Sequence, residues 1–564
     1  MITKINNNKW MKHLSAGACA LLFPLSSLLF PLSSLLLISC SLDEDPRDQI
    51  LEEAAYGTAK EIFQNTVATL YNYIGGSTDG QGLQGTCRCV YDLQTFGSDE
   101  AMLPTRGGDW YDGGLWCNMY RHSWNSDLEL GKNSWLYLYK VITLCNNSLE
   151  QIDAHRSLLT DSQMKAWKAE VRAIRAIYYW YLLDLFGRVP IITTSEVTVE
   201  EVMQRERSDL FQFVFSELME VLPFLPDGNS AQRGDCYGRV TKPVANFVLA
   251  KLMLNAEVYT DDDWTDGERP DGAGILINID GQTLNAWEAT VSFCDSIEDN
   301  GFWLEDEYES NFAVYNESSK ENIWTIPMDK DLYQTHQENM VRSWHYRHAS
   351  AYGFSGENGT CATLRTLQVF GCDTEEEDNR FFLNYWTDVV YDRNVNPVLD
   401  AFGEELCYYP WEVDMDISTS PYVEVAGARM KKYEIDLNAT KDGKLMDNDI
   451  VLFRFADVLL MRAEAYLRNG QPERGQADFD AVRSRAKMPL RPLTLENLSD
   501  ERLMELCWEG WRRQDMIRFG EYESLFKGNE YFDKVDERDG HTTVFPIPAD
   551  IMVMDPYLKQ NPGY

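Results

Sequence analysis

The stretch from residue 456 to residue 487, ADVLLMRAEAYLRNGQPERGQADFDAVRSRAK, decides the fold. Its first half carries small and apolar residues at helical spacing up to Gly470, and Pro472 then opens a second segment of the same kind. Small residues such as Ala463 and Ala477 let two helix backbones approach closely. Glycine after one helix and proline at the start of the next are ordinary stop and start signals. The stretch therefore predicts an antiparallel pair of helices joined by a tight turn.

The same helical periodicity recurs along most of the chain. Apolar residues fall at i, i+3 and i+4 spacing in the segments 51–74, 132–152, 161–187, 207–222, 242–259, 283–299, 448–469, 472–487 and 499–520. The densest segment is 161–187, which ends at Gly187 with Pro190 shortly after it. No 34-residue repeat can be followed along the chain. We therefore predict a mostly α fold built on degenerate tetratricopeptide-like helical hairpins.

Two stretches lack this pattern. Residues 76–125 and 301–447 are rich in Tyr, Trp, Asn, Asp and Gly, and contain short β-like runs such as Asn322–Ile326. Loops held on a rigid frame commonly carry function, so we expect an irregular, loop-rich ligand-binding half with short β segments. The predicted division is a helical region 51–300 with a loop insertion at 76–125, an irregular region 301–447, and a C-terminal helical region 448–564 that ends in a docked tail.

The N-terminus has the layout of a bacterial lipoprotein signal. Three lysines precede an uncharged apolar run that ends in Leu37-Ile38-Ser39-Cys40, with small residues at the cut site. Two prolines interrupt this run, whereas the alternative, a retained membrane helix, needs ~20 unbroken apolar residues. We therefore predict a signal peptide over 1–39, lipidation of Cys40, and an acidic leader over 40–50, which together hold the chain at a membrane surface.

Acidic residues dominate the charge of the chain. Asp and Glu number 90 against 51 Lys and Arg, a formal net charge of −39. Proteins bind phosphate backbones and anionic lipid headgroups through Lys and Arg, so nucleic acid is excluded as a partner. The twelve cysteines show no CxxC spacing, and no zinc site is predicted. A disulfide between Cys361 and Cys372 is one pairing that the spacing leaves open.

Four blocks of sequence carry a family resemblance. They are Ala169–Ala176 continuing through Leu185–Pro190, Gly238–Lys242, Phe453–Ala465, and the C-terminal FPIP at 545–548 with QNPGY at 560–564. Together with the Cys40 junction, these blocks resemble the SusD/RagB family of nutrient-uptake outer-membrane lipoproteins of Bacteroidetes, the SusD-like glycan-binding proteins. The acidic residues after Cys40 are also similar to the surface-export signal of these lipoproteins.

The resemblance implies a location, a partner and an activity. It implies a lipid-anchored position on the outer membrane that faces outward from the cell surface. It implies a partner, a SusC-like TonB-dependent transporter, which the lipoprotein covers like a lid. It implies binding of a glycan, without catalysis.

Candidate binding residues follow from the chemistry of sugars. A pyranose ring presents C–H groups that stack on aromatic faces, beside hydroxyls that bond polar side chains. The glycine-rich loop 99–113 supplies both kinds of group, and its tryptophan has no local helical or strand face to bury against. A second group lies in the irregular region. The predicted ligand-binding residues are Trp110 first, then Arg106, Asp109, Trp344 and Tyr352.

No cofactor is expected, with one tentative exception. Asp261, Asp263 and Asp266 precede a glycine in an arrangement that loosely resembles a calcium loop, although the closing Glu of an EF-hand is missing. A solvated acidic turn is the alternative interpretation. His345 and His348 lie three residues apart without a third ligand nearby, and are expected at the surface.

The sequence therefore predicts a non-catalytic protein that binds an oligosaccharide or polysaccharide at the cell surface and delivers it to a TonB-dependent transporter. A RagB-like protein with a peptide cargo is the alternative among binding proteins. A third hypothesis is a surface glycoside hydrolase, which needs only two carboxylates. Against an enzyme, the chain contains no G-x-S-x-G, H-E-x-x-H or Walker pattern.

Overall fold

The computed structural model describes residues 55–522 and 539–564. The predicted signal peptide over 1–39, the lipidation site at Cys40 and the acidic leader over 40–50 all lie outside the described residues. Among the helices in the described ranges, none combines the length and the apolar character needed to cross a membrane.

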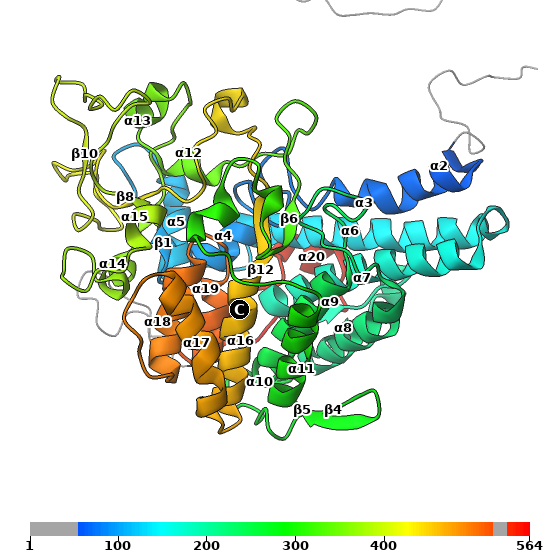
Figure 1. Cartoon of the computed structure of the whole chain (residues 1–564). Helices are drawn as coiled ribbons and strands as arrows, with labels where there is room; N and C mark the ends of the chain where they lie inside the picture. Colours follow the sequence, from blue (N-terminus) through cyan, green and yellow to red (C-terminus); the bar gives the residue numbers. More distant parts are fainter. Residues whose placement is uncertain (1–54, 523–538) are drawn as a thin grey trace, which may run out of the picture. The chain divides into compact units, whose positions relative to one another are not determined.

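Two long helices form the N-terminal frame. Helix α6 (Glu129–Ala154) and helix α7 (Asp161–Phe186), each 26 residues long, pack against each other (Figure 1). Thr160 caps α7 by accepting a hydrogen bond from the Gln163 backbone N–H, while the Gln163 side chain bonds the Thr160 backbone. Gly187 ends the helix with a positive φ of 64°. The densest apolar pattern in the sequence therefore forms the predicted helix.

The remaining long helices also pack in pairs, most of them between helices that lie close together along the chain. The contacting pairs are α7 with α8 (Arg207–Val221), α9 (Lys242–Leu254) with α11 (Ala286–Asp299), α11 with α16 (Phe455–Arg468), α16 with α17 (Pro472–Arg485), and α18 (Leu495–Leu506) with α19 (Arg512–Phe519). The other α-helices whose bounds fall within the described residues are α2 (Ala59–Phe63), α3 (Thr69–Tyr71), α4 (Val90–Thr95), α5 (Leu115–Tyr120), α10 (Ala256–Tyr259), α12 (Asn339–Ser343), α13 (Tyr346–Ala351), α14 (Leu364–Phe370), α15 (Phe381–Asn384) and α20 (Ala549–Met554). The predicted fold class, a helical-hairpin scaffold with a loop-rich half, is confirmed.

Two clear differences from the predicted helices lie near the C-terminus. The segment 448–469 is helical only from Phe455, because the apolar run Ile450–Phe453 and Arg454 after it form strand β12 (Ile450–Arg454). The segment 499–520 is divided between α18 and α19. Trp508 and Gly510 between these helices have positive φ values of 65° and 76°, which a right-handed helix cannot contain.

The strands among the described residues pair only as antiparallel two-stranded ribbons. The pairs are β1 (Ala101–Met102) with β7 (Cys361–Ala362), β2 (Val189–Pro190) with β3 (Gln204–Arg205), β4 (Leu276–Ile279) with β5 (Gln282–Asn285), β6 (Asn322–Ile326) with β12, β8 (Tyr385–Trp386) with β11 (Arg429–Met430), and β9 (Asp388–Val389) with β10 (Cys407–Tyr408). Figure 1 shows the loop-rich part (yellow-green, with β10 and α13) beyond the ends of α16 to α18. The described cysteines are all free, Cys361 and Cys372 included, so a disulfide between these two is not formed.

The β6–β12 ribbon joins the irregular region to the helices through an aromatic core. Phe453 on β12 stacks on Phe247 of α9, with ring centroids 4.2 Å apart. Trp324 on β6 and Trp511 before α19 lie against the same Phe453 ring, at 5.1 and 5.9 Å. Burial of such large rings dominates core energetics. The irregular region therefore rests on the same hydrophobic core as the helical scaffold.

A buried ion network lies beside this core. Arg454, at the end of β12, has no exposed surface and pairs with Glu321, Glu505 and Glu509 at 2.5–2.9 Å. Burial alone would raise the pKa of Glu505, but Arg485, Arg454 and Arg380 hold that pKa well below its usual value. The network connects the β6–β12 ribbon with α18 and the turn after it.

Asp449, just before β12, gives the stability a dependence on pH. Its carboxylate accepts hydrogen bonds from Tyr237 Oη, Thr325 Oγ1 and the Met328 backbone N–H at 2.7–3.0 Å, yet burial raises its pKa to about 7. Between the ordinary value of 3.8 and pH 7, the folded state holds a proton that the unfolded state has released. Stability is therefore lost through this group as the pH rises over that window.

The Asp449→Asn variant tests this dependence. We expect the unfolding free energy of the wild type, measured relative to the variant, to fall by a few kcal/mol between about pH 4 and pH 7. Chemical denaturation at several pH values measures this difference. The exposed Asp331→Asn variant serves as the control. A constant difference across the range would contradict the assignment.

Candidate functional site

The loop that carries Trp110 is closed by its own backbone. The N–H of Arg106 donates to the carbonyl of Asp109 and the N–H of Asp109 donates back, both at 3.0 Å. The Arg106 guanidinium is only 4% exposed and donates to the carbonyls of Val423 and Ala426 at 3.0 and 2.9 Å. This burial lowers the pKa of Arg106 to about 9. Arg106 therefore anchors the loop and does not face a ligand.

Trp110 is held in a defined position on this loop. Its backbone has a φ of 59°, which is uncommon for a residue other than glycine and often accompanies a functional constraint. Its indole N–H donates to the carbonyl of Glu357 at 2.8 Å. The ring packs against Gly359 and meets Trp116 edge-on, with centroids 6.1 Å apart. The half-buried ring is thus supported from behind while it lines a cavity.

Gly359 leaves the space in which the Trp110 ring lies. A Cβ at this position would come within 2.7 Å of Trp110 Cε2, so Gly359→Ala must displace the ring. We expect this variant to bind its ligand about tenfold more weakly, with a loss of ~1–3 kcal/mol in stability from overpacking. Gly108→Ala, in the Trp110 loop, is the matched control because a Cβ there meets no atom within 4 Å. Ligand titration and denaturant unfolding of both variants measure the two effects, and equal affinities would contradict this role of Gly359.

Exposed aromatic rings extend the Trp110 surface. Tyr111 is 59% exposed and Tyr346, at the start of α13, is 41% exposed. The Tyr346 hydroxyl donates to the carboxylate of Asp109. Burial and this carboxylate raise the pKa of Tyr346, so its hydroxyl stays protonated. Asp109 therefore ties the Trp110 loop to α13 and fixes two aromatic side chains on one surface.

A cavity of ≈ 580 Å³ opens beside Trp110. Acidic and basic side chains both line it, and they are Asp79, Arg88, Glu338, Glu357, Lys441 and Lys444. Most of these charges are paired: Lys444 Nζ lies 3.0 Å from Glu357 and 3.6 Å from Glu338, and Arg88 pairs with Asp112 at 2.7 Å. The Asp79 carboxylate, by contrast, forms no hydrogen bond with another described residue. The cavity therefore offers a free acceptor within a charge-balanced lining.

Asp79, Cys87 and Glu338 place possible metal ligands close together in this cavity. Their surroundings favour hydrogen bonding instead. One carboxylate oxygen of Glu338 contacts His336 Nδ1 at 2.5 Å, and the other accepts from the Cys87 thiol at 3.5 Å. Burial raises the pKa of Cys87 well above its ordinary value, which keeps sulfur in the thiol form, whereas metals bind the thiolate. These groups therefore bond one another rather than present a ready set of metal ligands.

Two of the predicted binding residues lie in the interior. Trp344 has no exposed surface, and its indole N–H donates to the Met430 carbonyl at 2.7 Å. Tyr352 is 8% exposed and donates to the Tyr391 carbonyl at 2.9 Å. Their rings pack together at 5.6 Å, with His348 stacked on Trp344 at 4.4 Å. Trp344 and Tyr352 therefore belong to the buried aromatic group on which α13 packs, and they offer no face to a ligand.

The histidine prediction is wrong for the same reason. His345 and His348 are both buried, not at the surface, and His348 packs within the aromatic group under α13. Burial lowers the pKa of His348 to about 3, so this ring is neutral at physiological pH.

The structure does not gather the predicted calcium ligands. Asp261 accepts from the Asp263 backbone N–H at 3.0 Å, Asp263 from the Thr265 hydroxyl at 2.7 Å, and Asp266 from the Glu268 backbone N–H at 2.8 Å. Each carboxylate therefore bonds within its own turn. Among the described residues, the three do not form a cluster with ligand atoms close enough to share an ion.

The sequence analysis missed the charged lining of the cavity. Asp79 and Arg88 belong to the insertion at 76–125, while Glu357, Lys441 and Lys444 come from the irregular region. The unusual composition of both stretches is a signal that marks them as functional. Which of their many charges converge depends on long-range packing and has no local signal.

Two family models match this chain. A model described as the SusD family matches residues 320–564. A second, described as "starch-binding associating with outer membrane", matches residues 98–254.

Full-length relatives are also similar. The starch-binding protein SusD of Bacteroides thetaiotaomicron is 25% identical over 86% of this chain and 87% of its own. A SusD-like protein, P25, of Formosa agariphila is 24% identical over 93% of this chain and 96% of its own.

Solved structures share the fold. The surface glycan-binding protein A of Bacteroides thetaiotaomicron, in complex with laminarihexaose, aligns with a TM-score of 0.66 at 18% identity, over 89% of this chain and 99% of that chain. A laminarin-binding SusD-like protein aligns with a TM-score of 0.65 at 20% identity, over 90% and 100% of the two chains.

Proposed function

This chain belongs to the SusD family, and we propose that it is a non-catalytic protein that binds an oligosaccharide at the Trp110 cavity. The observation that carries the proposal is the pairing of a supported, half-buried Trp110 ring with the free carboxylate of Asp79 in one cavity. The ring supplies an apolar face for sugar C–H groups, and the carboxylate accepts hydrogen bonds from hydroxyls.

The charge balance of the cavity points to the class of glycan. Lys444 and Arg88 are engaged by carboxylates of the protein, and Lys441 Nζ lies 2.6 Å from His336 Nε2. A uronic acid or sulfated sugar would therefore find Lys441 alone without a carboxylate partner, whereas a neutral oligosaccharide requires no cation. Relatives are described as binding starch and laminarin, both neutral glucose polymers, which makes glucans the first ligands to test.

Affinity electrophoresis of the purified protein in gels that contain starch, laminarin, xylan, mannan or polygalacturonate tests this function. We expect retardation by at least one neutral glycan and none by polygalacturonate. Absence of retardation by every neutral glycan would overturn the glycan proposal, and a peptide library would then test the alternative cargo. Release of reducing sugar during incubation with the retarding glycan would overturn the non-catalytic assignment.

We further propose that the protein is a surface-facing lipoprotein that passes its glycan to a SusC-like TonB-dependent transporter. The lipoprotein signal pattern that ends at Cys40 and the acidic residues after it support this location. Copurification of a transporter with the tagged protein from outer membranes tests the partnership.

The Cys40→Ala variant tests the anchor. We expect glycan binding by the purified variant to equal that of the wild type, because lipidation is chemically separate from the cavity. Surface display on intact cells, measured by antibody labelling, should be lost. Retained display would contradict anchoring through Cys40.

A further inference from the structure

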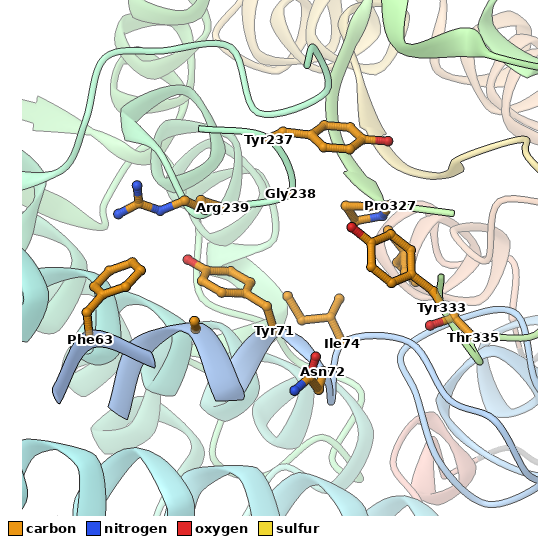
Figure 2. Close-up of a pocket in the computed structure, with 12 residues that line it drawn as sticks. Phe63, Tyr71, Asn72, Ile74, Tyr237, Gly238, Arg239, Pro327, Tyr333 and Thr335 are labelled. Atoms are coloured by element: carbon orange, nitrogen blue, oxygen red, sulfur yellow. The ribbon is translucent and has the colours of Figure 1, made fainter. Parts of the chain in front are cut away.

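A second cavity, of ≈ 260 Å³, lies between the N-terminal helices and the segment after β6. Figure 2 shows Phe63 and Tyr71 on the helical side, Tyr237 and Arg239 on the loop before α9, and Tyr333 on the opposite segment. None of the residues that line it lines the Trp110 cavity. It is therefore a separate aromatic site that the proposed function does not use.

Buried partners fix the rings of this cavity. Tyr71 Oη donates to Glu170 at 2.5 Å and accepts from the Val240 backbone N–H at 2.8 Å. Tyr237 Oη donates to both carboxylate oxygens of Asp449 at 2.7 Å. Two aromatic walls are thus set in place before any ligand arrives, which reduces the entropy lost on binding.

The backbone also closes tightly around the cavity. Gly238 has a φ of 74°, and a Cβ there would lie 2.5 Å from Pro327 Cγ. On the helical side, after α3, a Cβ on Gly75 would lie 2.4 Å from Thr335 Cγ2 of the segment after β6. The loop before α9 and the segment after β6 therefore approach more closely than side chains would allow.

The lining presents no free charge. Arg239 is the one ionisable cation or carboxylate among the residues that line the cavity. Both its Nε and an Nη donate to Glu170, at 2.9 and 2.5 Å, and its guanidinium lies 5.3 Å from the centroid of the Phe63 ring. A charged ligand would have to compete with this pair, in which the Glu170 side chain is buried and the Arg239 side chain half-buried, and breaking it is costly. The ligand is therefore neutral.

Three neutral polar groups remain available. The side chains of Asn72, Tyr333 and Thr335 line the cavity and make no hydrogen bond with another described residue. They supply an amide and two hydroxyls beside the aromatic walls. Flat apolar faces next to unpaired neutral donors and acceptors match a sugar ring, with its C–H faces and its equatorial hydroxyls.

The size of the cavity limits its occupant. Its volume lies below the ~300–1,000 Å³ of sites for drug-sized ligands, so it suits a single ring rather than a chain. The same two chain segments contribute lining residues to both cavities. Ile74 and Thr335 line this cavity, while Ser77 and His336, close by in sequence, line the Trp110 cavity. These segments are joined by a hydrogen bond from the His336 N–H to the Gly76 carbonyl at 2.8 Å.

We propose that this cavity is a second carbohydrate site, which holds one neutral sugar ring against Tyr71, Tyr237 and Tyr333. The choice of a sugar rests on the proposed function, whereas the neutrality and the size of the ligand follow from the cavity itself. Binding at one ring is weak, and its effect is to hold a terminal unit or a branch of a glycan near the Trp110 cavity.

Saturation-transfer NMR of the purified protein with glucose, galactose, mannose, xylose and N-acetylglucosamine at millimolar concentration tests the site. The measurements use the Trp110→Ala background, so that the first cavity does not contribute. We expect transfer to at least one of these sugars. Adding Tyr333→Ala should reduce that signal at least fivefold, and adding Ala68→Trp, which fills the cavity, should abolish it.

The controls separate this inference from the proposed function. Tyr333 is exposed and Ala68 half-exposed, so both variants should fold, which circular dichroism checks. Leu332→Ala, at an exposed neighbouring position, should leave the signal unchanged. Transfer to none of the five sugars, or transfer that survives both added variants, would overturn the second site even if the wild type binds polysaccharide. If no neutral polysaccharide retards the wild-type protein in the gels, the proposed function is overturned instead.

Discussion

Replacing Trp110 by alanine is expected to weaken oligosaccharide binding by about 30-fold or more, a loss of ~2 kcal/mol or above. The ring lines the cavity together with Trp116, and its support from Glu357 and Gly359 fixes it in place without a ligand. Truncation removes the apolar face that Trp110 offers beside the Asp79 carboxylate. Isothermal titration with the best glycan of the panel measures the change.

Trp303→Ala is the matched control for this experiment. Trp303 is 53% exposed and lines neither of the two cavities, so its removal should leave the affinity within about twofold of the wild type. An equal loss of affinity in both variants would mean that removing any exposed tryptophan has this effect, and would not single out Trp110. An unchanged affinity in Trp110→Ala would remove Trp110 from the site.

Replacing Arg454 by methionine is expected to lower the free energy of unfolding by ~3–5 kcal/mol, because the change leaves buried carboxylates without their shared cation. Arg454 is the common partner of Glu321, Glu505 and Glu509. Glu505 keeps Arg485 and Arg380, and Glu509 keeps Lys432. These remaining pairs limit the loss but do not remove it.

The pH dependence of this variant gives a second readout. The depressed pKa of Glu505 means that its ion pairs stabilise the fold above the ordinary value of 4.5, and that this stability is lost as the pH falls below it. The difference in unfolding free energy between the wild type and Arg454→Met should therefore become smaller as the pH falls below about 4.5. Denaturant unfolding at several pH values measures it. Lys487→Met serves as the control, because Lys487 forms an exposed pair with Glu307, and it should change the free energy of unfolding by less than ~1 kcal/mol. A similarly small effect of Arg454→Met would contradict the role of the network.

The helical scaffold could be predicted because its signals are local. The apolar spacing and the end signals of 161–187 lie within the helix that they describe, and α7 follows them closely. The run Ile450–Arg454 was harder, since a short apolar segment fits a strand or a buried helix equally well. Its pairing with Asn322–Ile326, more than a hundred residues earlier, decides the outcome.

The candidate site could be predicted only in part, for a related reason. Trp110 lies in a glycine-rich loop, so its own neighbours indicate that it escapes the core. Trp344 has an equally polar local sequence, but its burial depends on Met430 and Trp386, which the chain brings in from far away. Asp79 and Lys444 meet at one cavity only after the fold has formed.

The self-closed turn at Arg106–Asp109 makes the Trp110 loop a replaceable part. Its ends are fixed by the reciprocal backbone bonds and by the buried guanidinium, while Cβ atoms on the two glycines at its tip would meet nothing within 4 Å. A side chain introduced at Gly108 would extend into solvent without disturbing the scaffold, whereas Gly107, with a φ of 65°, is kept as glycine. Libraries built at this tip are thus a route to redesigning the glycan preference while the fold is kept.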